Sequence, residues 1–158
     1  MRIHVDSREQ ANTHIIRFFD KIGVEHIDDS SLNFGDYYAD GKVVVERKRN
    51  LTEFAANRGK NHQRFKRELE KLDESGWRMY ILIEQRISYE DMAAWENPRG
   101  KVKYRRLKNG ELKPIKPMSG AQMKAICDEW QKKHDIRFVF CEKRDSGREI
   151  IDILARDW

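Results

Sequence analysis

The stretch "KVVVERK", residues 42–48, places three valines directly before three charged residues, with no turn between them. Valine is enriched in strands, so residues 43–45 predict a buried strand. Its continuation carries Glu46, Arg47 and Lys48 toward the core, where ionised side chains destabilise a fold unless something compensates them. We therefore expect these charges to serve a function.

The order of these charges predicts a hydrolytic site. Side chains alternate across a strand, so Glu46 and Lys48 are expected on one face and Arg47 on the other. The carboxylate can bind a hard divalent cation, and the lysine can orient a water or stabilise charge that develops at phosphorus. Because Mg²⁺ prefers an octahedron of oxygen ligands, a second acid is expected from a neighbouring element.

Asp36 is the candidate for that second acid. The dipeptide Asp40-Gly41 is a strong hairpin signal, and it folds the strand that begins at Asp36 back onto the Glu46 strand. Counting back from the turn places Asp36 opposite residue 45 or 46. Gly35 lets the backbone bend or approach closely just before it. The two carboxylates are therefore expected side by side.

Two further acids follow the first predicted strand, in "VDSRE" (5–9). Asp6 and Glu9 stand at a strand end, where α/β sheets place their sites. Carboxylates that converge on one place repel one another at neutral pH, so such a cluster makes physical sense mainly around a cation.

Each of these residues also has an ordinary explanation when it is considered alone. Gly35-Asp36 could be turn chemistry, and Glu46 with Lys48 could be the solvated edge of a strand. The pair Arg8-Glu9 could be charges at a helix N-terminus. Their joint occurrence, in this order and on these elements, favours a functional site.

The rest of the chain alternates strands and helices, which predicts an α/β fold with one mixed sheet covered by helices on both sides. Residues 78–84, "RMYILIE", form a nearly continuous apolar run that indicates a central strand buried on both faces. The other predicted strands are 3–5, 24–27 and 136–140, and the predicted helices are 15–22, 51–72 as one helix or two, 88–96, 119–134 and 146–158.

Composition narrows the class of protein. The 158 residues fit one domain, and 32 Lys plus Arg against 27 Asp plus Glu give a net charge of +5. This basic balance suits a polyanionic partner such as nucleic acid. The isolated Cys127 and Cys141 argue against a zinc site and for a reducing compartment. No apolar leader or membrane-spanning run occurs, so we expect a cytoplasmic protein without a membrane partner.

Three motifs together resemble the nuclease domain of the XPF-type structure-specific DNA endonucleases, a branch of the PD-(D/E)xK restriction-endonuclease-like fold. They are "DSRE" (6–9), "LNFGDY" (32–37) and "VVVERK" (43–48), in the family's order. The tail, 138–154, is similar to the family's last strand and helix. The resemblance covers nearly the whole chain and implies a three-layer α/β/α nuclease domain over residues 1–158.

The resemblance implies specific roles for the charged end of the valine strand. Asp36 and Glu46 would bind Mg²⁺, for which Mn²⁺ would substitute, and the main-chain carbonyl of Arg47 would be a further ligand. Lys48 would orient the attacking water. The side chain of Arg47 would hold either the motif or the scissile phosphate, and the sequence does not choose between these roles.

The remaining motif residues are implied to complete the site: Glu9 as an additional acid near the metal, with Asp6 and Arg8 as its supports. The sequence departs from the family pattern where an aspartate is expected three residues after the lysine. Thr52 stands there, with Glu53 beside it. Either Glu53 substitutes for that acid or the acid is missing, which would weaken the support of the metal site more than abolish it.

Two basic segments are candidates for DNA contact. One is the helix after the motif, whose charges could equally be a solvated face. The other is 96–117, a basic loop expected to be irregular and mobile without DNA, with an aromatic stacking platform. The predicted contact residues are Arg8, Arg58, Lys60, Arg64, Lys101, Lys103, Tyr104, Arg105 and Arg106, with Arg67 on the same helix as Arg64.

The sequence therefore predicts a Mg²⁺-dependent endonuclease acting on branched or irregular DNA, in repair, recombination or replication. Alternatives are a DNA-binding module that does not cut, and an RNA-directed or restriction-like nuclease. The resemblance also implies a homodimer, although no exposed apolar stripe marks its interface. Many relatives append helix-hairpin-helix or helicase modules, whereas this chain ends at Trp158, and the compact form suggests a bacterial or phage origin.

Overall fold

A six-stranded mixed sheet forms the centre of the computed structural model, which describes residues 1–56, 62–98 and 103–156. β3 runs antiparallel to both β1 and β4, whereas β1 is parallel to β2, and β4, β5 and β8 are parallel to one another. This confirms the mixed sheet expected from the sequence. The strands lie in the order β2 (His26–Asp28), β1 (Ile3–Val5), β3 (Tyr37–Tyr38), β4 (Val43–Lys48), β5 (Arg78–Glu84) and β8 (Ile136–Cys141).

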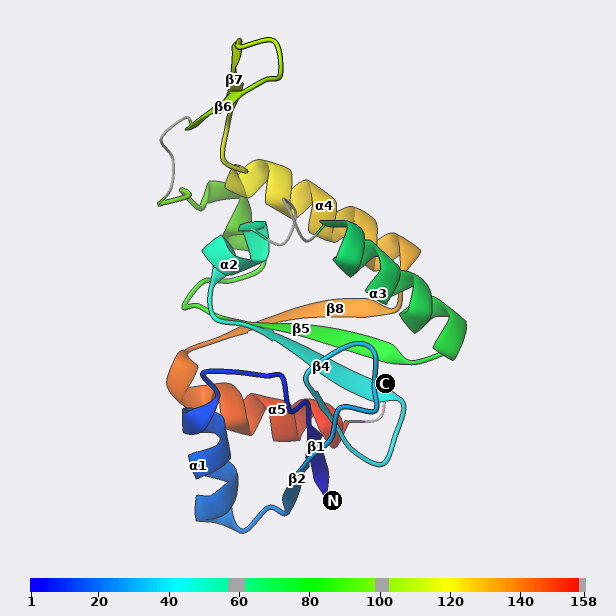
Figure 1. Ribbon diagram of the computed structural model, residues 1–158. Coiled ribbons are helices and arrows are strands. Elements are labelled where there is room, and N and C mark those ends of the chain that lie inside the picture. Colours follow the sequence, from blue (N-terminus) through cyan, green and yellow to red (C-terminus); the bar gives the residue numbers. More distant parts are fainter. Residues whose placement is uncertain (57–61, 99–102, 157–158) are drawn as a thin grey trace.

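Helices cover both faces of the sheet, which confirms the three-layer α/β/α arrangement (Figure 1). One layer holds α2 (Leu51–Ala56), α3 (His62–Ser75) and α4 (Gly120–Lys133). The opposite layer holds α1 (Thr13–Ile22) and α5 (Ser146–Leu154). Across the described ranges, no helix combines the length and the apolar character needed to cross a bilayer.

The alternation of β4 explains why a valine run can end in charges. Val44 packs into the core beneath α2, α3 and α4, whereas Val45 packs into the core beneath α1 and α5. The same period of two places Glu46 and Lys48 on the first face and Arg47 on the second, as predicted. The strand thus delivers Glu46 and Lys48 to one layer of the fold and Arg47 to the other.

β5 is the buried central strand that the sequence predicted. It lies between β4 and β8, parallel to both, and its apolar residues alternate between the two cores. The strand ends in Glu84, whose side chain is buried despite its charge. Like β4, β5 therefore carries a carboxylate into the protein at its C-terminal end.

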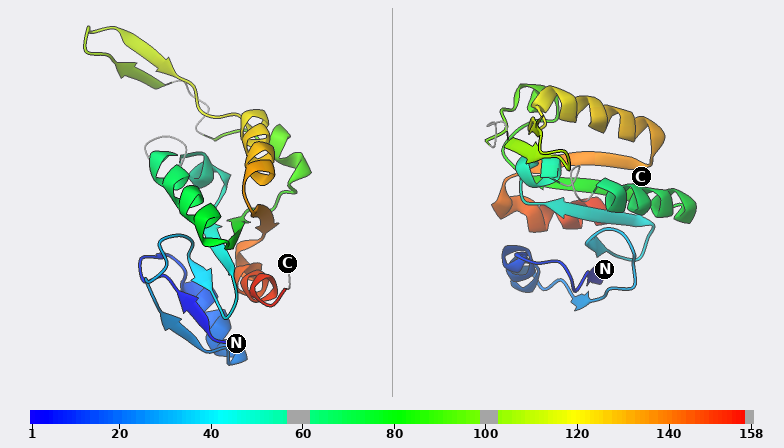
Figure 2. Two further views of the ribbon diagram at one scale, coloured as in Figure 1. Left: turned by 90° about the vertical axis from the view of Figure 1, so that its right-hand side faces the viewer. Right: turned by 45° about the horizontal axis from the view of Figure 1, so that its top comes forward.

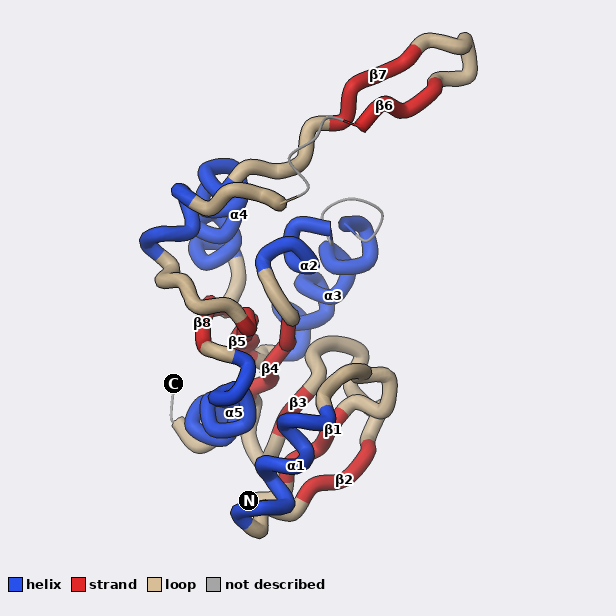
Figure 3. Tube along the Cα trace, turned by 90° about the vertical axis from the view of Figure 1, so that its left-hand side faces the viewer, coloured by secondary structure: helices blue, strands red, loops and turns tan. Residues whose placement is uncertain are grey.

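Several predicted elements differ from those observed, and among them the last helix ends at Leu154 and the strand expected from Asp36 is reduced to Tyr37–Tyr38. The second strand is His26–Asp28 instead of 24–27, and the helix predicted at 88–96 is a short 3₁₀ helix, η1 (Glu90–Ala94). The segment 96–117 is not irregular throughout, because β6 (Lys103–Arg106) and β7 (Leu112–Ile115) pair antiparallel. Figures 2 and 3 show this ribbon extending away from the rest of the molecule.

Candidate active site

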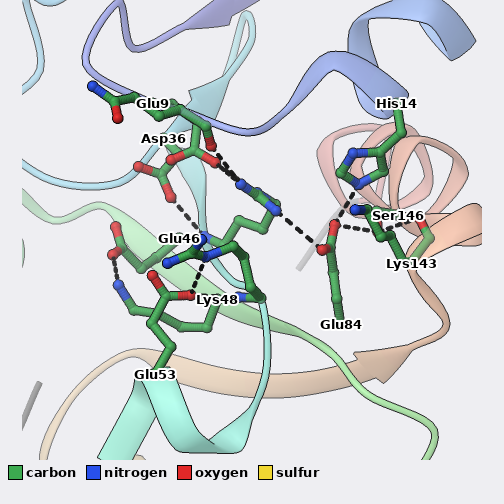
Figure 4. A network of polar contacts seen from close by, with 12 residues as sticks. Glu9, His14, Asp36, Glu46, Lys48, Glu53, Glu84, Lys143 and Ser146 are labelled. Atoms are coloured by element: carbon green, nitrogen blue, oxygen red, sulfur yellow. Dashed lines mark hydrogen bonds and ion pairs between the residues drawn. The ribbon is translucent and has the colours of Figure 1, made fainter. Parts of the chain in front are cut away.

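The β3–β4 hairpin places Asp36 next to Glu46. The main-chain N–H of Asp36 donates to the carbonyl of Val45 at 2.8 Å, and Oδ2 of Asp36 accepts from the main-chain N–H of Arg47 at 2.7 Å. Tyr37 pairs with Val45, so the position before it, Asp36, comes opposite Glu46. The structure confirms the predicted juxtaposition of the two carboxylates, which Figure 4 shows together with their neighbours.

Gly35 allows this juxtaposition. Its φ is +74°, a left-handed conformation that L side chains rarely adopt. A Cβ at this position would also lie 2.1 Å from Cγ2 of Val44. The backbone before Asp36 therefore approaches the neighbouring strand more closely than any residue with a side chain permits.

We expect Gly35→Ala to destabilise the fold by about 2–4 kcal/mol, because overpacking adds to the strain of a left-handed backbone. Gly23→Ala is the matched control, since Gly23 has a φ of +71° and nothing lies within 4 Å of a Cβ there. Thermal unfolding of both variants measures the difference. Equal losses of stability would show that contact with Val44 contributes nothing.

The side chain of Lys48 contacts the carboxylate of Glu46, which lies two residues earlier on the same face of β4. Its Nζ contacts Oε1 of Glu46, and both side chains are nearly buried. Loss of hydration alone would lower the pKa of Lys48, but the negative charges of Glu46 and Asp36 outweigh it and raise that pKa above its usual value. In the metal-free protein, Lys48 is therefore a protonated ammonium that donates hydrogen bonds.

For Asp36, burial and the acidic neighbours shift the pKa in the same direction. Its pKa is raised well above its usual value, first because the carboxyl is withdrawn from water and then because Glu46 and Glu9 are negative neighbours. The main-chain N–H of Arg47 and the charge of Lys48 compensate only in part. Without a further positive charge, the ionised pair of carboxylates destabilises the site.

A divalent cation fits this arrangement. Within the described ranges, no three acidic, histidine or cysteine side chains gather closely enough to hold a metal by themselves. Mg²⁺ commonly needs only one or two carboxylates, since water and substrate phosphate oxygens complete its shell. Asp36 and Glu46 would supply those carboxylates, and the cation would relieve their repulsion.

The side chain of Arg47 resolves the choice that the sequence left open. Its Nε donates to Oε1 of Glu9 at 2.6 Å, Nη1 to Oε2 of Glu84 at 3.0 Å, and Nη2 to the carbonyl of Gln10 at 2.8 Å. The guanidinium is buried, with 3% of the side chain exposed. Arg47 therefore holds the motif together from the α1–α5 side, and only its main-chain carbonyl could serve a metal.

Glu9 is close to the acid pair but is bound to Arg47. The pKa of Glu9 is raised overall. Burial raises it most, the charge of Arg47 opposes this shift, and the charge of Glu46 adds to it. Asp6 and Arg8 form a local support: Nη2 of Arg8 donates to Oδ2 of Asp6 at 2.6 Å and to the carbonyl of Leu32 at 3.3 Å. The pair thereby ties the first motif to the loop that leads to Asp36.

Glu84 is the residue of this network that the sequence analysis missed. It accepts from Arg47, and its Oε1 lies 2.6 Å from Nε2 of His14 and accepts from Oγ of Ser146 at 2.7 Å. Its side chain is 1% exposed. The available signal was a glutamate closing an apolar run, the pattern that identified Glu46.

Glu53 supplies part of what the family's aspartate, replaced here by Thr52, is expected to supply. Its Oε2 accepts from the main-chain N–H of Arg49 at 2.6 Å, and Oδ1 of Asn50 accepts from the main-chain N–H of Glu53 at 2.8 Å. The negative charge of Glu53 still contributes to the raised pKa of Lys48. Thr52 instead lines a separate cavity of about 250 Å³.

A pocket of about 330 Å³ opens onto the acid pair. Asp36 and Glu46 form part of its lining, and α3 supplies the basic side chains Arg64, Arg67 and Lys71. Arg64 also pairs with Glu68 at 3.0 Å, and loss of hydration together with the charge of Glu46 raises the pKa of Glu68. The other lining residues are Asp6, Arg8, Asn33, Phe34, Gly35 and Glu68.

The predicted DNA contacts separate into three groups. Arg8 and Arg64 line this pocket, joined by Lys71, which the sequence analysis did not include. A second group lies on the β6–β7 ribbon, outside the pocket lining: Lys103, Tyr104, Arg105 and Arg106. Arg58, Lys60 and Lys101 lie outside the described residues.

Comparison with known proteins agrees with this geometry. The fold resembles XPF from Aeropyrum pernix, with a TM-score of 0.66 and 19% identity over 98% of this chain and 63% of that chain. It resembles the same protein in complex with DNA with a TM-score of 0.64 and 21% identity, over 97% and 62%. The chain thus spans less than two thirds of each, and the structural likeness shows a shared fold.

No curated protein matches the sequence. The model of the ERCC4 domain matches residues 5–154, a span that begins at the last residue of β1 and contains all three motifs and the other five strands of the central sheet. This chain belongs to the ERCC4 domain family.

Proposed function

We propose that the chain is a Mg²⁺-dependent endonuclease that hydrolyses phosphodiester bonds in branched or irregular DNA, in repair, recombination or replication. One observation carries the proposal: Asp36 and Glu46 lie side by side on a pocket that α3 lines with basic side chains. The carboxylates suit a cation, and the basic side chains suit the phosphates on either side of the reacting one.

The reaction requires a water oxygen to bond to phosphorus while the bond from phosphorus to the leaving oxygen breaks. A bound Mg²⁺ would supply a water of lowered pKa and would neutralise charge on the phosphate. Lys48, held as an ammonium by Glu46, would donate a hydrogen bond to the attacking water or to a phosphate oxygen. The chain itself contributes positioning and positive charge.

The residues around the pair keep this geometry fixed. Arg47 presents its main-chain N–H to Asp36 while its guanidinium is bound to Glu9 and Glu84 on the other side of the sheet. A shift of β4 would break all of these contacts together. Such second-sphere support is what keeps a metal-binding carboxylate in position.

The family supports the choice of substrate. XPF from Aeropyrum pernix has been solved in complex with DNA, and this chain shares its fold. By the XPF-type resemblance, branched DNA is the expected form. A non-catalytic binding module would have no use for an acid pair with a buried ammonium beside it.

Cleavage of labelled flap, fork, four-way-junction and linear duplex DNA, together with RNA of matching sequence, tests the proposal. With Mg²⁺ or Mn²⁺ we expect cutting of the branched DNAs, and none in EDTA. Binding without cutting in either metal would make the chain a binding module. Equal cutting of the linear duplex would indicate a restriction-like enzyme, and preferential cutting of RNA an RNA-directed one.

A further inference from the structure

The β6–β7 ribbon projects from the domain as a separate arm (Figures 2 and 3). Its turn is well formed: the main-chain N–H of Leu107 donates to the carbonyl of Glu111 at 2.8 Å, and Gly110 takes a φ of +87°. All of its strand residues are exposed. A projecting two-stranded ribbon buries too little apolar surface to contribute to the core, so its sequence is free to serve binding.

The register of the ribbon sorts its side chains onto two faces. Residues directly opposite in an antiparallel pair share a face, and faces alternate along each strand. One face carries the pairs Lys103 with Ile115 and Arg105 with Lys113. The other face carries the pairs Tyr104 with Pro114 and Arg106 with Leu112.

The two faces therefore differ in chemistry. The first presents three cations, Lys103, Arg105 and Lys113. It also carries Ile115, which is 49% exposed. The second presents Tyr104 and Leu112, which are 64% and 57% exposed, with Arg106 as its one cation. Between residues 103 and 116 the chain has six Lys or Arg and a single acid, Glu111. Charge of this sign and density fits a polyanion.

The base of the ribbon lies close to the catalytic end of β4. Lys103 and Ile115 line the cavity of about 250 Å³ that Thr52 and Ala55 of α2 also line. α2 begins three residues after Lys48. α2 therefore connects the base of the ribbon to the strand that carries Glu46 and Lys48.

We propose that the ribbon is a two-sided DNA-binding arm for sites where a duplex meets an unpaired strand. Lys103, Arg105 and Lys113 contact phosphates, and Tyr104 stacks on an unpaired base, which exposes a π-face that paired bases in a duplex conceal. This assignment rests on the proposed function, because it takes DNA as the substrate. It goes further by naming the face that recognises the branch.

Fluorescence anisotropy in EDTA, where no cutting occurs, separates the two faces. Removing the cations in Lys103→Ala/Arg105→Ala/Lys113→Ala is expected to weaken binding to fork, single-stranded and duplex DNA alike, and to lower the slope of log K against log salt by about 2–3. Tyr104→Ala is expected to weaken fork and single-strand binding about 5- to 150-fold, with duplex binding unchanged.

The matched control is Arg17→Ala/Lys21→Ala/Arg148→Ala, which removes the same charge from exposed positions on α1 and α5. The arm is disproved if wild type binds and cuts DNA while the ribbon triple variant binds like this control. Loss of fork and duplex binding to the same extent in Tyr104→Ala would disprove the stacking role. Failure of wild type to bind any DNA would instead reject the proposed function.

Discussion

Replacing Asp36 with asparagine is expected to raise the melting temperature of the metal-free protein and to lower its cleavage rate strongly once metal is added. Asparagine keeps the shape and the acceptor for the main-chain N–H of Arg47 but removes a charge that faces Glu46 and Glu9. Relieving this repulsion raises the melting temperature, by about 2–4 °C for each kcal/mol of free energy gained in a domain of this size. Losing the cation ligand lowers the cleavage rate by about 10³-fold.

The charge of Asp36 also makes the stability of the metal-free protein depend on pH. The pKa of Asp36 is higher in the folded than in the unfolded chain, so the folded state binds more protons once the pH exceeds the usual value of 3.8. Its contribution to stability is fully present below that pH and is lost as the pH rises through the folded pKa. Metal-free wild type should therefore lose stability over this range more steeply than Asp36→Asn.

Asp152→Asn serves as the control, because it removes an exposed carboxylate from α5, away from the site. Differential scanning fluorimetry in EDTA between pH 4 and 8 follows both variants beside wild type. Suppose that Asp36→Asn melts below wild type at every pH and that the two curves of melting temperature against pH have the same slope. This result would mean that the acid pair is not under electrostatic strain.

Arg47→Met is expected to be the most destabilising single substitution in the network. It leaves the carboxylates of Glu9 and Glu84 buried without their shared cation, and removing one partner of a buried ion pair costs about 3–5 kcal/mol. Arg49→Met is the matched control, because Arg49 is 61% exposed and its pair with Glu53 spans 3.4 Å. An exposed pair of this kind contributes at most about 1 kcal/mol.

A double-mutant cycle separates charge from packing. Adding Glu84→Gln to Arg47→Met should recover part of the lost stability, because the second substitution removes one of the stranded charges. Urea unfolding of the four proteins gives the coupling free energy directly. If Arg47→Met costs no more than Arg49→Met, the buried guanidinium does not hold β4 to Glu9 and Glu84.

The acid pair could be predicted because its evidence is local in the sequence. A period of two assigns Glu46 and Lys48 to one face, and the Asp40-Gly41 turn signal brings Asp36 opposite residue 45 or 46. The observed register, with Tyr37 paired to Val45, selects Glu46. Asp36 was also marked by Gly35, whose close approach to Val44 the structure confirms. No long-range information was needed for this part of the site.

The role of Glu84 could not be predicted, because its partners come from distant parts of the chain. His14 is 70 residues away and Ser146 is 62 residues away, and both arrive with helices of the α1–α5 layer. Local periodicity identifies a buried strand but not the side chains that another layer supplies to its end. Sequence alone therefore left the role of Arg47 undecided as well.

The ribbon was missed for a different reason. Asn109-Gly110 is as strong a hairpin signal as Asp40-Gly41, yet the flanking strands contain charges and Pro114 in place of alternating apolar residues. Those strands pair without covering a core, so the usual pattern is absent. Turn chemistry was here a better guide than hydrophobic period.

The decisive experiment is single-turnover cleavage of a labelled fork in Mg²⁺, with saturating wild type, Asp36→Asn, Lys48→Ala and the control Lys42→Ala. Lys42 is exposed and immediately precedes β4, at the end opposite Lys48. We expect wild type and Lys42→Ala to cut at the same rate, with losses of about 10²-fold or more for Lys48→Ala and Asp36→Asn at unchanged DNA affinity. Cutting by either site variant at the wild-type rate would contradict the assignment of Asp36, Glu46 and Lys48 as the catalytic centre.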